Sequence, residues 1–150
     1  MKNFKSQFKG ATDSPGFLLW KVSNLHQRLQ RKALSGIDLT PTQFSVLASY
    51  FFLYQKLGAV QQAVICNHTG IDKMQVSDVT KALVKAKFIQ RKSNPNDKRS
   101  SLIAVTTSGQ KKCNDALEII ESLDEKFFSV CENFELFLGD LNKLALNSDE

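Results

Sequence analysis

The 150-residue chain has few cysteines and no long apolar run. Its three cysteines, at positions 66, 113 and 131, are too few and too scattered for a disulfide framework. No stretch approaches the ~20 consecutive apolar residues of a membrane span. Residues 1–10 are basic but lack the apolar segment of a secretory signal. We therefore expect one globular domain, residues 1–150, that works in the cytoplasm and not at a membrane.

Sequence motifs of catalysis are also absent. The seven glycines form no phosphate-binding loop, no nucleophile elbow is present, and no carboxylate pair accompanies a histidine base. Cys66 and His68 are two residues apart, but two ligands do not complete a tetrahedral zinc site, so a packing role is favoured over a metal. We expect a binding protein without cofactor or metal rather than an enzyme.

Charge is distributed unevenly along the chain, whose net charge is +5. Residues 1–60 carry eight Lys/Arg and two Asp/Glu, and residues 61–112 carry ten and three. Residues 113–150 reverse the balance, with two Lys/Arg and ten Asp/Glu. This division indicates two surfaces with different partners, one of them a polyanion. Ordinary solvated charge is the alternative, and charge alone does not separate the two.

Two helices are predicted in the first sixty residues. Ser14-Pro15 supplies a cap and a first-turn proline, and the apolar residues that follow share one face: Leu18, Val22, Leu25 and Leu29. A second helix begins at Thr40-Pro41-Thr42-Gln43, which has the pattern of a capping box. The helix is expected to run to about Leu57, and its expected buried stripe consists of Phe44, Leu47, Ala48 and Phe51.

Residues 61–109 have the pattern of a winged helix-turn-helix. A short helix over residues 61–69 stops at Gly70, and a second helix from about Asp72 turns four residues inward: Val76, Val79, Leu83 and Ala86. Two strand-like stretches, residues 88–92 and 102–105, flank a polar turn. The predicted fold is mainly α with a small β-hairpin wing, and residues 37–109 form its DNA-binding lobe.

The helix from Asp72 presents a face that suits a DNA groove. At about 100° per residue, one side carries the residues we call the reading face: Lys73, Met74, Ser77, Asp78 and Lys81. The lysines can bind phosphate or guanine, and the serine can form a hydrogen bond to a base or to the DNA backbone. The methionine can contact a thymine methyl group. The aspartate can accept a hydrogen bond from a cytosine amine or position a neighbouring lysine. Gln75, near the helix start, can reach adenine or phosphate. An ordinary solvated face is the alternative, and the adjacent hairpin favours DNA.

The C-terminal third carries apolar residues at alternating spacings of three and four, close to a heptad seam. The seam consists of Cys113, Leu117, Ile120, Leu123, Phe127, Val130, Phe134, Phe137, Leu141 and Leu144. One helix of this length would leave the seam in water, so it needs a partner. We expect a break near residues 131–134, because the sequence there is rich in phenylalanine and is followed by Gly139.

Several of these motifs together resemble the MarR (multiple antibiotic resistance regulator) family of bacterial repressors. The resemblance is carried by Leu39–Phe44, Ile71–Lys73, Val76, Leu83, Phe88–Arg91, Asn96–Arg99, Leu102 and Val105–Gly109. The family shows Asp-x-Arg at its wing and a leucine-threonine-x-x-glycine leading into the next helix. The order of elements matches over residues 14–148.

The resemblance implies a homodimer built from residues 14–36 and 110–148, which places two lobes on a pseudo-palindromic operator of double-stranded DNA. It implies a transcriptional regulator, a repressor that a small molecule or another signal releases. Arg99, with Lys98 beside it, would reach the minor groove or phosphate, and Asp97 would orient Arg99 through a charge-paired hydrogen bond. It also implies an effector crevice that Trp20 and His26 could line.

The chain departs from the family pattern at three positions. Lys87 stands where the family usually has glycine, which would strain a left-handed helix cap by about 1 kcal/mol. Asp78 replaces a commonly basic or neutral residue, which puts the usual operator preference in doubt. Thr69 occupies a usually aliphatic position, so the helix-turn-helix core can pack differently.

Two other functions remain open from the sequence. A winged-helix adaptor or antirepressor without operator binding would explain Asp78 on the reading face and the acidic tail. A redox sensor is the second possibility, since one branch of the family reacts with peroxide through an N-terminal cysteine, which is missing here. Cys113 and Cys131 lie on the apolar seam and are expected to be inert, but Cys113 is the better redox candidate because it starts a helix.

Overall fold

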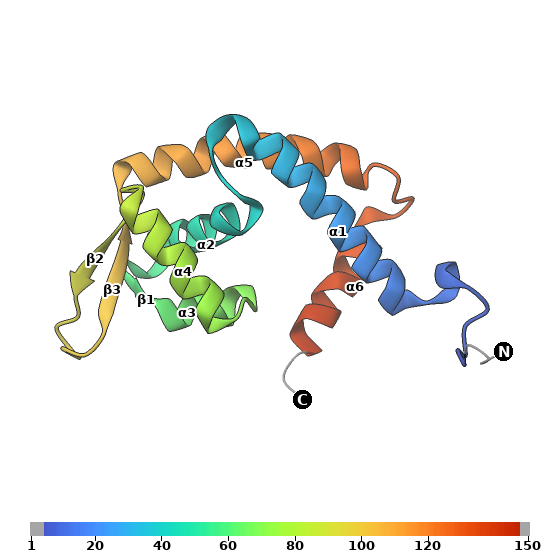
Figure 1. The fold of residues 1–150 in the computed structure, drawn as a ribbon, viewed down its shortest axis with the longest axis horizontal. Helices are drawn as coiled ribbons and strands as arrows, with labels where there is room; N and C mark the ends of the chain where they lie inside the picture. The colour runs from blue at the N-terminus through green and yellow to red at the C-terminus, as the bar shows by residue number, and fades with distance from the viewer. Residues whose placement is uncertain (1–4, 148–150) are drawn as a thin grey trace.

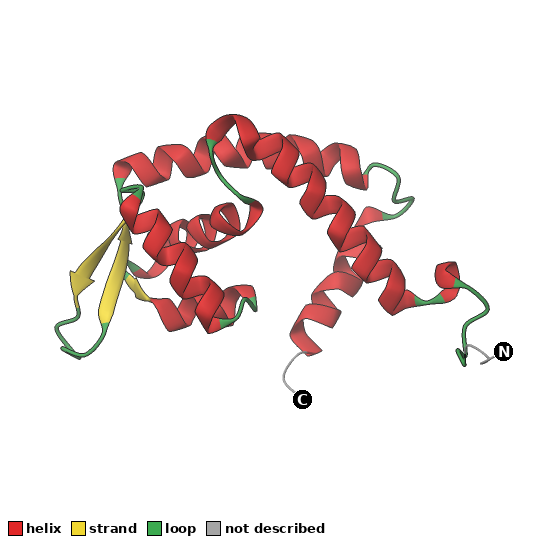
Figure 2. Ribbon diagram, viewed as in Figure 1, coloured by secondary structure: helices red, strands yellow, loops and turns green. Residues whose placement is uncertain are grey.

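The computed structural model describes residues 5–147. The ends of the expected domain, residues 1–4 and 148–150, lie outside the described residues. Helices dominate, and a small antiparallel sheet lies at one end of the molecule (Figures 1 and 2). The elements are η1 (Ala11–Asp13), α1 (Pro15–Leu34), η2 (Ser35–Ile37), α2 (Pro41–Leu57), β1 (Val60–Gln61), α3 (Gln62–Thr69), α4 (Lys73–Lys85), β2 (Ile89–Ser93), β3 (Ser101–Val105), α5 (Thr107–Phe128) and α6 (Phe134–Leu146). The mainly α winged-helix fold is confirmed. No helix between residues 5 and 147 is long and apolar enough to cross a membrane.

The predicted helix starts are confirmed by their caps. The hydroxyl of Ser14 accepts a hydrogen bond from the backbone N–H of Phe17 at the start of α1, at 3.4 Å. At the start of α2, the Thr40 hydroxyl accepts from the Gln43 backbone at 3.1 Å, and the Gln43 side chain accepts from the Thr40 backbone at 3.0 Å. This reciprocal pair satisfies two amides that a helix start leaves without partners.

The sheet has one strand more than the sequence predicts. Strands β2 and β3 pair antiparallel, with Ile89 opposite Val105, as the hairpin pattern indicates. The third strand, β1, pairs with the other edge of β3, where Val60 lies opposite Ile103. Two residues are too few for strand alternation to appear in the sequence, so β1 could not be predicted from periodicity.

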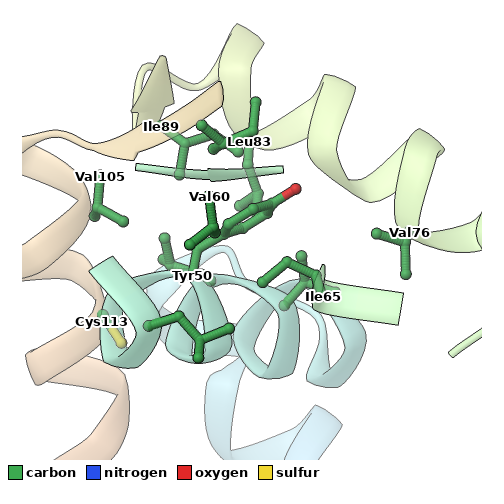
Figure 3. Close-up of a cluster of buried hydrophobic side chains, with 12 residues drawn as sticks. Tyr50, Val60, Ile65, Val76, Leu83, Ile89, Val105 and Cys113 are labelled. Carbon is green, nitrogen blue, oxygen red and sulfur yellow. The ribbon is translucent and has the colours of Figure 1, made fainter. Parts of the chain in front are cut away.

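The main core surrounds α2, which α3, α4, α5 and the sheet contact (Figure 3). The predicted stripe of α2 is buried or half-buried, but Val46 and Tyr50, off that stripe, are fully buried as well. A helix with neighbours on several sides has no single buried face. Sequence periodicity therefore identified only part of the core around α2.

The apolar faces of α1 and α6 are largely exposed in the single chain. The expected stripe of α1 is not buried: Leu18, Val22 and Leu25 are 37 to 43% exposed. The C-terminal region breaks where expected, between Phe128 and Phe134. The seam divides with it, because Cys113 and Ile120 of α5 are buried within the chain whereas α6 has no buried residue.

Candidate nucleic-acid interface

The turn between α3 and α4 fixes where the second helix starts. Gly70 ends α3 in the left-handed conformation, with φ of 69°. The Thr69 hydroxyl donates to the Ile65 carbonyl at 2.7 Å and accepts from the Ile71 backbone at 3.2 Å, so it holds the turn by hydrogen bonds rather than by aliphatic packing. The Asp72 carboxylate then caps α4 by accepting from the Gln75 backbone at 2.9 Å. Side-chain hydrogen bonds thus hold the turn on both sides of Gly70.

Helix α4 turns the predicted residues outward, with one exception. Lys73, Met74, Gln75, Asp78 and Lys81 are exposed, whereas Ser77 is half-buried. The inward set is mostly as predicted, since Val76 and Leu83 are buried and Val79 is half-buried. Ala86 is exposed, contrary to the prediction, because α4 ends at Lys85 and Ala86 is its cap. Thr80, which the sequence did not single out, is fully buried.

Asp78 lies beside a lysine on the reading face. The Lys81 ammonium donates to the Asp78 carboxylate at 3.4 Å, and both side chains are about two-thirds exposed or more, at 67% and 72%. An exposed pair of this kind contributes little to stability. Asp78 can therefore position Lys81 in the way the sequence suggested and lower the positive charge of the face by one.

The loop at the tip of the hairpin, residues 94–100, is held by its own polar groups; we call it the wing loop. Asn94 is buried, donates to the Ser100 hydroxyl at 2.8 Å and accepts from the Asn96 backbone at 3.0 Å. Lys98 and Arg99 at the tip are exposed. A loop organised from within presents its two cations at a defined place while leaving them in solvent.

Asp97 supports the wing loop differently from the prediction. Its carboxylate accepts from the backbone N–H of Arg99 at 2.9 Å. The expected pair between the Asp97 carboxylate and the Arg99 guanidinium is not among the ion pairs found between residues 5 and 147. An aspartate two residues before an amide closes an Asx turn. This local bond shapes the turn and leaves the guanidinium of Arg99 available.

The base of the wing is joined tightly to the start of α5. Lys87 has φ of 63°, so the left-handed cap expected there is present on a non-glycine residue. The Thr106 hydroxyl donates to the Lys87 carbonyl at 2.7 Å and accepts from the Gly109 backbone at 3.0 Å. The same threonine therefore caps α5 and holds the segment that links α4 to the hairpin.

The model of the MarR family matches residues 39–101, from just before α2 into β3. The HTH-type transcriptional regulator YdcH of Bacillus subtilis is 39% identical over 139 residues, which cover 93% of this chain and 95% of that protein. The chain belongs to the MarR family.

Two solved structures show proteins with the same fold. A mutant MarR from Escherichia coli, complexed with operator DNA, has a TM-score of 0.75 at 24% identity, over 86% of this chain and 91% of that one. CouR from Rhodococcus jostii, bound to p-coumaroyl-CoA, has a TM-score of 0.79 at 24% identity, over 94% of this chain and 98% of that one. The fold of this MarR-family regulator thus also occurs in a protein solved with DNA and in one solved with a ligand.

The structure places the two suggested effector residues in different surroundings. His26 lines a polar crevice of about 520 Å³ together with Ser45 and Ser49 of α2, His68 at the end of α3, and Gln75 of α4. Its Nε2 lies 2.7 Å from a carboxylate oxygen of Asp124 on α5. Trp20 does not line this crevice; it is 65% exposed on α1 and lies near Phe17.

The three cysteines differ in exposure. Cys113 is buried, and desolvation raises the pKa of its thiol to about 11. It lies in the second turn of α5, which begins at Thr107, and so beyond the first turn in which a helix start favours a thiolate. The idea that Cys113 is the better redox candidate is therefore wrong, because a reactive thiol needs a populated, accessible thiolate. Cys66 and Cys131 are half-buried. Within residues 5–147, no three His, Cys, Asp or Glu side chains gather as a metal site would require.

Proposed function

We propose that this MarR-family regulator binds double-stranded DNA through α4 and the wing loop and represses transcription. The observation that carries the proposal is the joint exposure of Lys73, Lys81, Lys98 and Arg99, on an anchored helix and an anchored loop. The start of α4 and the tip of the hairpin lie on the same side of the molecule, the lower side in Figure 1. The major groove of B-DNA is wide enough to admit an α-helix, so α4 can enter it while the hairpin reaches the flanking backbone.

The protein acts as a homodimer in this proposal. Residues 14–36 and 110–148 are its dimerisation segments, and residues 37–109 are its DNA-binding lobe. The exposed apolar residues of α1 and α6 support this division, because the single chain leaves them in water: Leu19, Trp20, Leu136 and Leu144 are 59 to 67% exposed. A two-fold dimer would place its lobes on half-sites about one helical turn, ~34 Å, apart.

A small molecule releases the DNA in this proposal by occupying the crevice beside His26. The crevice joins α1 and α2 to the end of α3 and the start of α4, so a ligand there would touch Gln75 directly. Its lining suits a polar ligand, because it includes two histidines, hydroxyl groups and glutamine amides. A ligand that fits one lobe position better than another shifts the equilibrium between the two. The protein works in the cytoplasm, and by binding rather than catalysis.

A second candidate is an adaptor or antirepressor that binds another protein. The Asp78–Lys81 pair favours it, because a carboxylate on the reading face repels phosphate. A salt titration with random DNA fragments separates the two functions. Steep loss of affinity with rising salt supports DNA binding, since Lys and Arg contacts release counterions. Absence of binding at low salt would leave the adaptor.

A further inference from the structure

The buried face of α4 makes a polar contact to α2. The hydroxyl of Tyr50 lies 3.0 Å from the hydroxyl of Thr80, and neither residue has measurable exposure. Tyr50 occupies the middle of the apolar cluster in Figure 3, with its ring extending from α2 past Val60. Burial raises the pKa of Tyr50, so its hydroxyl stays protonated and can donate to or accept from Thr80.

Thr80 stands where the buried face of α4 meets the reading face. It follows Val76 by four residues and precedes Leu83 by three, and both are buried. It also follows Ser77 by three residues and directly precedes Lys81. A rotation of α4 about its axis would move Thr80 and the reading face together. The hydrophobic effect is non-directional, whereas a hydrogen bond between two buried hydroxyls holds their oxygen atoms within about 3 Å of each other.

The stability of the core does not require this polar pair. Phenylalanine and valine would fill almost the same volume without any hydroxyl to satisfy, and replacing both partners of a buried hydrogen bond in this way is often nearly neutral. Removal of one partner is different, because it leaves the other hydroxyl buried without a partner. The pair therefore adds a constraint that the hydrophobic effect alone does not supply, which is a fixed distance between one point of α2 and one point of α4.

We propose that Tyr50 and Thr80 are positioning residues whose hydrogen bond fixes the rotation of α4 and thereby sets the discrimination between operator and non-specific DNA. The inference rests on the proposed function, because it assigns a role to residues behind the reading face. Discrimination depends on side chains that meet base edges in one register, whereas contacts to phosphate tolerate small rotations. Loss of the bond should therefore weaken operator binding and leave non-specific binding almost unchanged.

The test uses three variants of the full chain: Thr80→Val, Thr80→Ser, and Tyr50→Phe combined with Thr80→Val. Two duplexes serve as probes, one that the wild-type protein enriches from a random pool and one in which its half-sites are scrambled. Discrimination is measured as the dissociation constant for the scrambled duplex divided by that for the enriched duplex, at one salt concentration. The thermal midpoint of each variant is measured as well. We expect Thr80→Val to lower the ratio about tenfold, the size of one mismatched base pair, and Thr80→Ser to retain it.

The double variant separates positioning from stability. It leaves no hydroxyl buried without a partner, so we expect its thermal midpoint to return close to that of the wild type while its discrimination stays low. A double variant with wild-type discrimination would overturn the inference. A wild-type protein that enriches no duplex would instead refute the proposed function, and the inference with it.

Discussion

The start of α5 passes so close to Phe88 that only glycine fits at position 109. A Cβ on Gly109 would overlap the carbonyl group of Phe88, 2.7 Å from the carbonyl carbon and 3.0 Å from the Cα atom. Both contacts are with backbone, which cannot rotate aside. The absence of a side chain at Gly109 therefore allows the segment before β2 to lie directly against α5, where Thr106 also binds it.

Substitution of Gly109→Ala should lower the free energy of unfolding by about 1–3 kcal/mol, as overpacking of a close contact does. Gly139→Ala is the matched control, because Gly139 lies in α6 with nothing within 4 Å of the added carbon. It should raise the free energy by up to about 1 kcal/mol through helix propensity. Urea denaturation measures both, and equal effects of the two substitutions would show that the contact at Phe88 is not tight.

Substitution of Lys87→Gly should stabilise the protein by about 0.5–1 kcal/mol. Lys87 has φ of 63°, a conformation that costs a side-chain-bearing residue more than glycine. Lys85→Gly provides the control on the same helix, since Lys85 is still helical and its replacement should destabilise by up to about 1 kcal/mol. Two losses of stability of similar size would contradict the strain at Lys87.

Substitution of Arg99→Ala should weaken DNA binding and flatten its dependence on salt. Each phosphate contact contributes about 0.9 to the slope of log K against log salt, so a dimer that loses two contacts should lose about 1.8. The control is Lys143→Ala, which removes one positive charge on α6, where Lys143 pairs with Asp140 at 2.9 Å. A slope that Arg99→Ala leaves unchanged would refute the assignment of the wing.

Cys113 should resist modification in the folded protein. With a thiol pKa of about 11, its thiolate is scarce at pH 8, and burial adds a steric barrier. Iodoacetamide should label Cys66 and Cys131 first and reach Cys113 only on unfolding, which peptide mass spectrometry measures. Labelling of Cys113 at the rate of the other two would show that its site opens readily.

The same shift gives a dependence of stability on pH. The thiol of Cys113 has a higher pKa in the folded chain than the ordinary value of 9.0, so the folded state holds this proton more tightly than the unfolded state. The contribution of the Cys113 thiol to the free energy of unfolding is therefore complete below about pH 9 and is lost as the pH rises toward 11. Urea denaturation should show that the free energy of unfolding falls less between about pH 9 and 11 for Cys113→Ala than for the wild type.

Features set by neighbours in the sequence were predicted well. The caps at Ser14 and Thr40 and the turn at Gly70 depend on groups within a few residues of one another, and the hairpin joins two strands that one loop separates. Lys87 belongs to the same class, because a helix end before a strand needs a backbone reversal whichever residue occupies it. Local chemistry of this kind can be derived from a single sequence.

Features that depend on distant residues were missed or misassigned. The bond between Tyr50 and Thr80 joins residues 30 apart, and that between His26 and Asp124 joins residues 98 apart. The stripe of α1 has the period of a buried face, but a period does not say whether the covering surface belongs to the same chain. Asp97 illustrates a third limit, since a carboxylate beside both an amide and a guanidinium can accept from either.

Selection of duplexes from a random DNA pool by the 150-residue chain tests the central claim most directly. Recognition by two lobes of a symmetric dimer predicts enriched sequences with dyad symmetry and half-sites one helical turn apart, about 10 base pairs from centre to centre. An Arg99→Ala protein should enrich them less strongly. Failure of the wild-type protein to enrich any sequence at low salt would contradict the account.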